Sequence, residues 1–105
     1  MAWTVAYHPS AIEEVDAQPE DIRSRLDHVI EVIREQGLDR VPSKLTRHLR
    51  DELWEFRLKG KDGIARALYV TRKGQRVFIV RCFAKKTQKT PLREIRLALQ
   101  RAEEV

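Results

Sequence analysis

Three lysines lie between an apolar, strand-like segment and the expected start of the last helix. They are Lys85, Lys86 and Lys89, in the run Phe83-Ala84-Lys85-Lys86-Thr87-Gln88-Lys89-Thr90-Pro91. Ammonium groups, threonine hydroxyls and the free N–H groups of a helix start all bind phosphate oxygens. The run therefore predicts a phosphate-contacting surface. The alternative is a solubilising loop, the commoner explanation for an isolated group of lysines.

Two arginines lie in an expected hairpin, with Arg57 before the turn Lys61-Asp62-Gly63 and Arg66 after it. A two-residue loop at Lys61-Asp62 places them directly opposite each other, and a loop at Asp62-Gly63 shifts the pairing by two residues. Both turns leave the side chains on one face, because side chains alternate with period two. Opposed like charges repel unless an anion lies between them. The alternative is a solvated face on which both arginines interact with Glu55 or the helices.

The basic residues are concentrated in the C-terminal part of the chain. Residues 64–101 hold eleven Lys/Arg against Glu94 alone, whereas residues 1–63 hold ten Lys/Arg against thirteen Asp/Glu, and the net charge is +5. This asymmetry favours a polyanionic partner, of which nucleic acid is the commonest.

The composition fits one compact domain over residues 1–105. Its single cysteine, Cys82, excludes an intramolecular disulfide and is expected to be a small buried thiol. The three histidines lack metal-ligand spacing, so no metal or other cofactor is expected. No apolar run is long enough for a membrane span and no signal-peptide pattern precedes the domain, so we expect a cytoplasmic protein.

The N-terminal half is predicted to form one strand and two helices. A strand over residues 3–7 stops at Pro9, and Ser10 is the expected cap of a helix that ends near Gln18. A second helix starts at Pro19, and its apolar stripe ends before Gly37. Residues 38–52 give a poor signal and are expected to form a loop.

The C-terminal half is predicted to form three strands and a helix. One strand begins at Leu53, the next covers Ile64–Thr71, and residues 77–80 form a doubly buried, central strand after a turn at Lys73-Gly74-Gln75. Thr90 caps the last helix, with Pro91 at its first position and a helical stripe behind it that consists of Leu92, Ile95, Leu99 and Ala102. The predicted fold class is α+β, in the order β-α-α-β-β-β-α.

Three motifs resemble the RelE/ParE toxin superfamily, and within it the phage-derived, HigB-like subgroup. They are Leu53-Trp54-Glu55-Phe56-Arg57, then Arg66 followed by Tyr69, then Phe83-x-Lys85-Lys86-Thr87-Gln88-Lys89-Thr90-Pro91-x-x-Glu94-Ile95. The resemblance covers nearly the whole chain. It implies a RelE-like fold, a small and mostly antiparallel sheet with two N-terminal helices packed on it and a concave basic face.

The resemblance also implies the toxin of a type II toxin-antitoxin system, which cleaves messenger RNA on the ribosome. Its other partner would be a cognate helix-turn-helix antitoxin. The catalytic positions carried over are Arg57, Arg66, Lys85 and Lys86. The residues expected to contact RNA are Lys59, Tyr69, Arg81, Thr87 and Lys89.

The expected chemistry is attack by the RNA's own 2′-hydroxyl on the adjacent phosphate. Arg57 and Arg66 suit the charge that develops on the phosphate, since they bind its oxygens and stay protonated. A lysine crowded by cations loses its proton more easily, so Lys85 or Lys86 is expected to exchange protons.

The chain departs from the family pattern in three respects. RelE-type enzymes commonly have a tyrosine near the last helix, but no tyrosine follows Tyr69, so the base is unassigned. Glu52 and Arg81 stand where the subgroup often has glycine and histidine. Two other functions stay open: a ParE-like inhibitor of DNA gyrase, and a non-catalytic nucleic-acid-binding domain.

Overall fold

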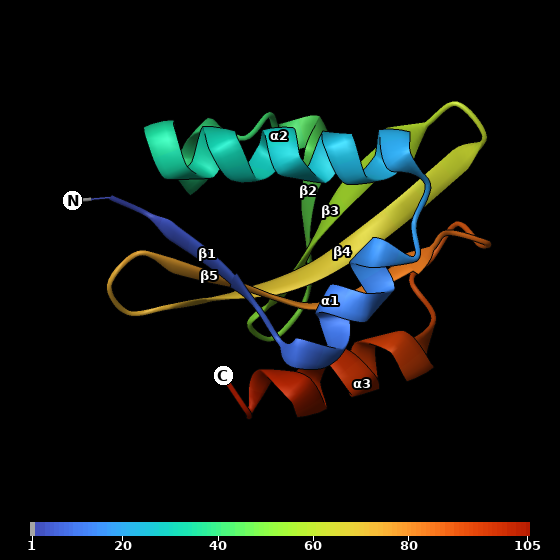
Figure 1. Cartoon of the computed structure of the whole chain (residues 1–105). Helices are drawn as coiled ribbons and strands as arrows, with labels where there is room; N and C mark the ends of the chain where they lie inside the picture. Colours follow the sequence, from blue (N-terminus) through green and yellow to red (C-terminus); the bar gives the residue numbers. More distant parts are fainter. Residues whose placement is uncertain (1) are drawn as a thin grey trace.

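A computed structural model describes residues 2–105, and Met1, where the expected domain begins, lies outside the described residues. The chain forms a five-stranded sheet with helices on both faces (Figure 1). In chain order its elements are β1 (Thr4–Tyr7), α1 (Pro9–Asp16), α2 (Glu20–Gln36), the 3₁₀ turns η1 (Leu38–Arg40) and η2 (Ser43–Leu45), β2 (Thr46–Arg50), β3 (Leu53–Gly60), β4 (Gly63–Arg72), β5 (Arg76–Ala84) and α3 (Leu92–Ala102). The predicted α+β class is confirmed.

The sheet has the strand order β1-β5-β4-β3-β2. β1 pairs with β5 in parallel, and the other neighbours are antiparallel. The expectation that residues 77–80 form the central strand is wrong, because β4 holds the middle position. β5 is nonetheless an inner strand, and Val77, Ile79 and Val80 in it are fully buried.

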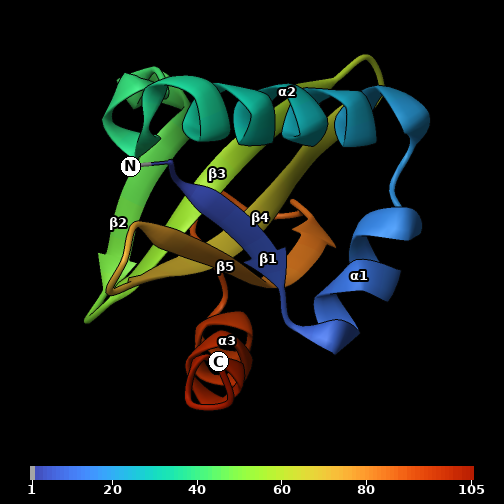
Figure 2. The same ribbon diagram turned by 60° about the vertical axis from the view of Figure 1, so that its left-hand side comes forward.

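In Figure 2, α2 lies on one face of the sheet and α3 on the other, and an apolar cluster packs on each face. On one face α2 packs against residues such as Phe56 and Leu58, and α1 lies beside β5. On the other face Ala98 and Ala102 of α3 pack on Leu68 and neighbouring residues of the strands. Leu92, expected in the buried stripe of this helix, is 43% exposed, so the packed part of α3 begins further along the chain.

Residues 38–52 are not the expected loop, because they form η1, η2 and the edge strand β2. β2 pairs with β3 and sets Arg47 opposite Glu55. Its sequence Thr-Arg-His-Leu-Arg carries little apolar surface, and none of its residues is buried. An edge strand of this kind gives no hydrophobic pattern to read.

Two helix starts differ from the expectation. His8, not Ser10, caps α1, since its Nδ1 accepts a hydrogen bond from the Ser10 N–H at 3.1 Å. Pro91 is the cap residue of α3, and the side chain of Thr90 makes other contacts, described below. The second helix runs from Glu20 to Gln36, within one residue of the predicted range. No helix in residues 2–105 is long and apolar enough to cross a membrane.

The β3–β4 hairpin has the two-residue loop Lys61-Asp62, because Gly60 pairs with Gly63. Asp21, at the start of α2, accepts the Lys61 N–H at 2.7 Å and so ties the hairpin end to the helix. A Cβ on Gly60 would lie only 2.6 Å from Asp21 Oδ2, so this approach requires glycine.

Candidate phosphate-binding site

Arg57 and Arg66 are directly opposite each other in the β3–β4 register. Their surroundings differ, because Arg57 is exposed and Arg66 is only 3% exposed. The alternative of a solvated face for both arginines therefore fails for Arg66, although its interaction with Glu55 is present. Strand alternation places both on the face that also carries Leu68 and α3.

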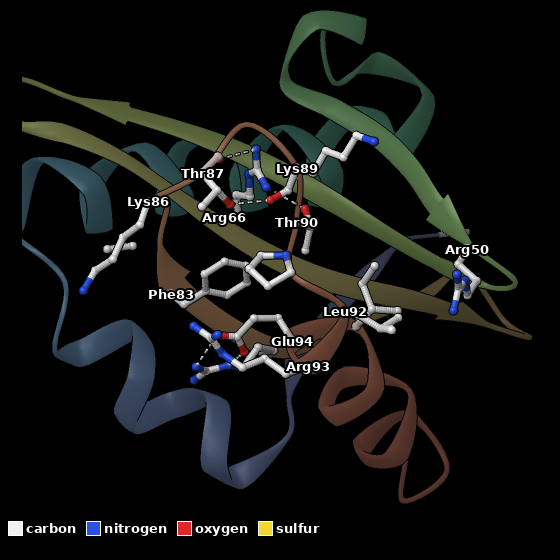
Figure 3. A pocket seen from close by; sticks show the side chains of 14 residues that line it. Arg50, Arg66, Phe83, Lys86, Thr87, Lys89, Thr90, Leu92, Arg93 and Glu94 are labelled. Carbon is white, nitrogen blue, oxygen red and sulfur yellow. Dashed lines mark hydrogen bonds and ion pairs between the residues drawn. The ribbon is translucent and has the colours of Figure 1, made fainter.

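Arg66 holds the segment that follows β5 against the sheet (Figure 3). Its guanidinium donates hydrogen bonds to Thr90 Oγ1 at 2.7 Å, to the Gln88 carbonyl at 2.6 Å and to the Thr87 carbonyl at 3.4 Å. Burial lowers the pKa of Arg66, while Glu55 acts in the opposite direction. An arginine keeps its proton at neutral pH, so Arg66 is a fixed cation beneath this segment.

Glu55 joins Arg66 in a buried network. Its Oε1 accepts a hydrogen bond from Thr90 Oγ1 at 2.7 Å and lies 3.7 Å from Arg66 Nε. Its Oε2 lies 3.0 Å from a terminal nitrogen of Arg47 on β2. A buried carboxylate is tolerated when cations and hydrogen-bond donors surround it, as they do here.

A cleft, named here the β2–β4 cleft, opens beside this network. It is lined by Ser43, Lys44, Thr46, Arg47, Glu55, Arg57, Arg66, Lys85 and Gln88. Partial burial lowers the pKa of the Lys85 ammonium, and the charges of Arg57 and Arg66 lower it further. The cleft thus combines the fixed guanidinium of Arg66 and the exposed ones of Arg47 and Arg57 with an amine that loses its proton more readily than a free lysine does.

The second lysine of the motif faces a different hollow, on the other side of the segment after β5. This α3 hollow has an apolar part formed by Phe83, Pro91, Leu92 and Ile95, and a basic rim formed by Arg50, Lys86, Lys89 and Arg93. In Figure 3 the Lys86 side chain points away from Arg66. The structure therefore separates Lys86, Thr87 and Lys89 from Lys85, although Arg66 lines both hollows.

Tyr69 is not available to stack on a base, contrary to the expectation. Its ring is 2% exposed and stacks on Phe56 with centroids 3.9 Å apart, on the α2 face of the sheet. Its hydroxyl lies 2.6 Å from Thr46 Oγ1. Trp54 is the more accessible aromatic residue, at 39% exposure.

Arg81 is engaged within the protein rather than free for RNA. It forms a two-pronged ion pair with Glu94, at 2.7 and 3.1 Å, and a second pair with Glu14 at 2.7 Å. The hydrogen bonds that Arg81 donates to Glu94 raise the pKa of Arg81. Lys59, by contrast, is exposed on β3 two residues beyond Arg57, on the same face.

Sequence reasoning missed Arg47 as part of this site. It named Glu55 only as an alternative partner of the two arginines, and Thr90 only as a helix cap and a phosphate contact, so the network that joins them to Arg66 was not predicted. Alternation along β3 places Glu55 on the face of Arg57, so a signal for Glu55 was present. No signal identified Arg47, because its strand was not recognised.

Outside the two hollows, the cysteine of residues 2–105 is buried in the core. Burial raises the pKa of the Cys82 thiol to about 12, and the nearby Glu14 carboxylate adds to this effect. Cys82 is 2% exposed, as expected of a small core residue. In the described part of the chain, no three His, Cys, Asp or Glu side chains lie close enough to hold a metal ion.

A family model described as "Phage derived protein Gp49-like (DUF891)" matches residues 13–103. The chain belongs to this Gp49-like family. The match includes β2 to β5 and all of α3, and with them both hollows. No curated protein matches the chain significantly.

Solved structures place the Gp49-like fold with RelE toxins. A double arginine-to-alanine mutant of the E. coli toxin RelE, in the free state, superposes with a TM-score of 0.68 at 15% identity, covering 96% of this chain and 98% of that chain. An archaeal RelE–RelB complex from Pyrococcus horikoshii OT3 gives a TM-score of 0.55 at 16% identity, covering 80% of this chain and 96% of that chain. The predicted RelE-like fold is confirmed, and the HigB-like subgroup stays a prediction.

Proposed function

We propose that this Gp49-like chain is the toxin of a toxin-antitoxin system and cleaves messenger RNA bound to the ribosome. The observation that supports this function best is the β2–β4 cleft, where exposed Arg57 and the partly buried Lys85 lie around fixed Arg66. Cations of this kind bind a phosphate group. Binding alone does not require an amine with a lowered pKa, whereas proton transfer by Lys85 does benefit from one.

The side chains in the cleft suit cleavage by the RNA's own 2′-hydroxyl. In this reaction the 2′-oxygen attacks phosphorus, the bond to the 5′-oxygen breaks, and the products are a 2′,3′-cyclic phosphate and a 5′-hydroxyl end. Arg57 binds the non-bridging oxygens, where negative charge grows in the transition state. Lys85 donates a proton to the leaving 5′-oxygen. The reaction needs no metal ion, because arginine and lysine supply the positive charge.

Arg66 has a different part in this proposal. Its terminal nitrogens are already bonded to Thr90, Gln88 and Thr87, so it positions the segment that carries Lys85 and adds a fixed positive potential. Lys86, Thr87 and Lys89 face the α3 hollow, where they contact RNA away from the scissile phosphate. The ribosome aligns the RNA for in-line attack.

Primer extension on a translated message, after brief induction of the toxin, tests this function. The wild type should produce new 5′ ends within codons, and Arg57→Ala should abolish them. Arg25→Ala removes an equally exposed arginine on α2 and is the matched control. Growth arrest without new RNA ends, accompanied by inhibited DNA supercoiling, would favour the gyrase inhibitor instead.

A further inference from the structure

The proposed cleavage also needs a group that takes the proton from the 2′-hydroxyl. Among the described residues that line the β2–β4 cleft, Glu55 is the single carboxylate, and the other charged residues are Lys44, Arg47, Arg57, Arg66 and Lys85. Arginines keep their protons at neutral pH, and Lys85 must start protonated if it is the acid. Glu55 is therefore the group in the cleft that is suited to accept a proton.

The two carboxylate oxygens of Glu55 have different partners. Oε1 is bound by Thr90 at 2.7 Å and lies near Arg66, and these contacts fix the orientation of the carboxyl group. Oε2 contacts Arg47 at 3.0 Å. The Arg47 side chain is 59% exposed, so it is free to move from Glu55 to an incoming phosphate. One oxygen is thus held, and the other can be released when RNA binds.

We propose that Glu55 is the general base of the reaction, an inference that rests on the proposed ribonuclease function. Glu55 Oε2 takes the proton of the 2′-hydroxyl while the 2′-oxygen forms its bond to phosphorus. The bond from phosphorus to the 5′-oxygen breaks, and Lys85 gives its proton to that oxygen. The enzyme ends with a neutral Glu55 and a neutral Lys85, and water exchanges both protons before the next turnover.

Other candidates for the base are placed less well. The Tyr69 hydroxyl lies on the α2 face with its ring covered, and Lys86 faces the α3 hollow. Cations approach Glu55 from β2 (Arg47), β3 (Arg57), β4 (Arg66) and the segment after β5 (Lys85). Their charge also favours the alkoxide that forms as the 2′-hydroxyl loses its proton.

The test measures single-turnover cleavage of RNA on purified ribosomes, comparing a normal linkage with one in which sulfur replaces the 5′-bridging oxygen. A thiolate leaves without protonation by an acid. The sulfur substitution therefore restores the cleavage rate of a variant that lacks the general acid, but not of one that lacks the general base. Glu55→Gln keeps an acceptor for Thr90 and removes the basicity. It should slow cleavage of both RNAs by at least ~100-fold, whereas Lys85→Ala should be restored on the sulfur RNA.

Thr90→Val separates catalysis from positioning, because it breaks the contact to Glu55 Oε1 and keeps the carboxylate. Its saturating rate should exceed that of Glu55→Gln, even if more ribosome is needed for half saturation. Equal rates in these two variants, rescue of Glu55→Gln by sulfur, or full activity of Glu55→Gln would overturn the proposal.

A measurement on the unmutated protein covers the case in which Glu55→Gln does not fold. With the sulfur RNA, the wild-type rate should rise about tenfold per pH unit on the acid side, as expected for a base that must be deprotonated. A flat profile would refute the assignment of Glu55. Failure of the wild type to cleave either RNA would refute the ribonuclease function itself.

Discussion

Arg57 and Arg66 show how two identical residues, paired across a sheet, differ in energetic role. Opposed like charges repel, and the structure reduces this repulsion by placing the Glu55 carboxylate beside Arg66. Glu55 and two backbone carbonyls surround Arg66, which is buried, and Arg57 remains exposed. Of the two arginines, Arg57 is therefore the one that is chiefly available to bind a phosphate group.

We predict that the two alanine variants differ in stability. Arg57→Ala should change the free energy of unfolding by no more than about 0.5 kcal/mol, as for most surface substitutions. Arg66→Ala leaves Glu55 buried with one cation fewer and should cost about 3 kcal/mol. Urea unfolding of both purified variants measures the difference. Equal stabilities would show that the Arg66 network contributes nothing to folding.

A second prediction concerns the Lys85 amine. Its pKa lies below the ordinary lysine value of 10.5, through partial burial and then through Arg57 and Arg66. The amine therefore gives up its proton at a lower pH in the folded protein than in the unfolded chain. Arg57→Ala should raise this pKa, as followed by NMR titration of the lysine side chain. An unchanged titration in that variant would show that Arg57 does not act on Lys85.

Alternation along the strands predicted part of the site. It placed Arg57 and Arg66 on one face, and it also excludes Tyr69, which lies an odd number of residues after Arg66 and faces α2. The network around Arg66 could not be predicted in the same way. It depends on how the segment from Lys85 to Thr90 folds back, and this conformation is determined by contacts distant in sequence.

At the scale of elements, the carboxylate of Glu14 links α1, β5 and α3. Glu14 on α1 accepts the Cys82 N–H of β5 at 3.1 Å and pairs with Arg101 of α3 at 2.8 Å and with Arg81 at 2.7 Å. β1 pairs with β5 only as far as Ile79, so the Cys82 N–H has no strand partner on that side. Glu14 therefore completes the edge of β5 and links both faces of the sheet.

Glu14→Gln should destabilise the protein by about 2 kcal/mol at neutral pH. Burial acts to raise the pKa of Glu14, but hydrogen bonds from Arg101 and Cys82, with the charge of Arg81, hold it below its usual value. A carboxylate with a lowered pKa stabilises the fold above its unfolded-state pKa, and this contribution disappears as pH falls through the folded-state value. The stability difference from wild type should therefore shrink in acid, as measured by urea unfolding across pH. A constant difference would contradict the assigned ion pairs.

Elements with a strong apolar period were predicted well, and the others were not. The apolar stripe of α2 predicted a helix from Pro19 to just before Gly37, and the structure has it from Glu20 to Gln36. β2 was not predicted, because an exposed edge strand needs no alternation of apolar residues. The central position of β4 was missed because its neighbours are determined by topology, and β5 is equally buried.

At the scale of the whole molecule, charge is unevenly distributed over the surface. The β2–β4 cleft and the rim of the α3 hollow are basic, whereas α1 and the start of α2 carry exposed acids, Glu13, Asp16 and Glu20. Glu14 follows Glu13 in the sequence, but its ion pairs with Arg81 and Arg101 remove it from the free surface charge. A basic partner such as a DNA-binding antitoxin would therefore be attracted to the exposed acids.

The last prediction concerns the rate at which that partner associates. Glu13→Lys combined with Glu20→Lys should slow association with the cognate antitoxin at low salt, because long-range attraction accelerates the encounter of oppositely charged surfaces. The effect should fade as salt screens the charges. Stopped-flow mixing at several ionic strengths measures it, with Arg25→Glu as a control that changes charge on a neighbouring turn of α2 in the attractive direction. Glu14→Lys is not a suitable probe, since it would disrupt the contacts to Arg81 and Arg101. Unchanged association rates at low salt would exclude electrostatic steering by α1 and α2 and leave the nuclease proposal intact.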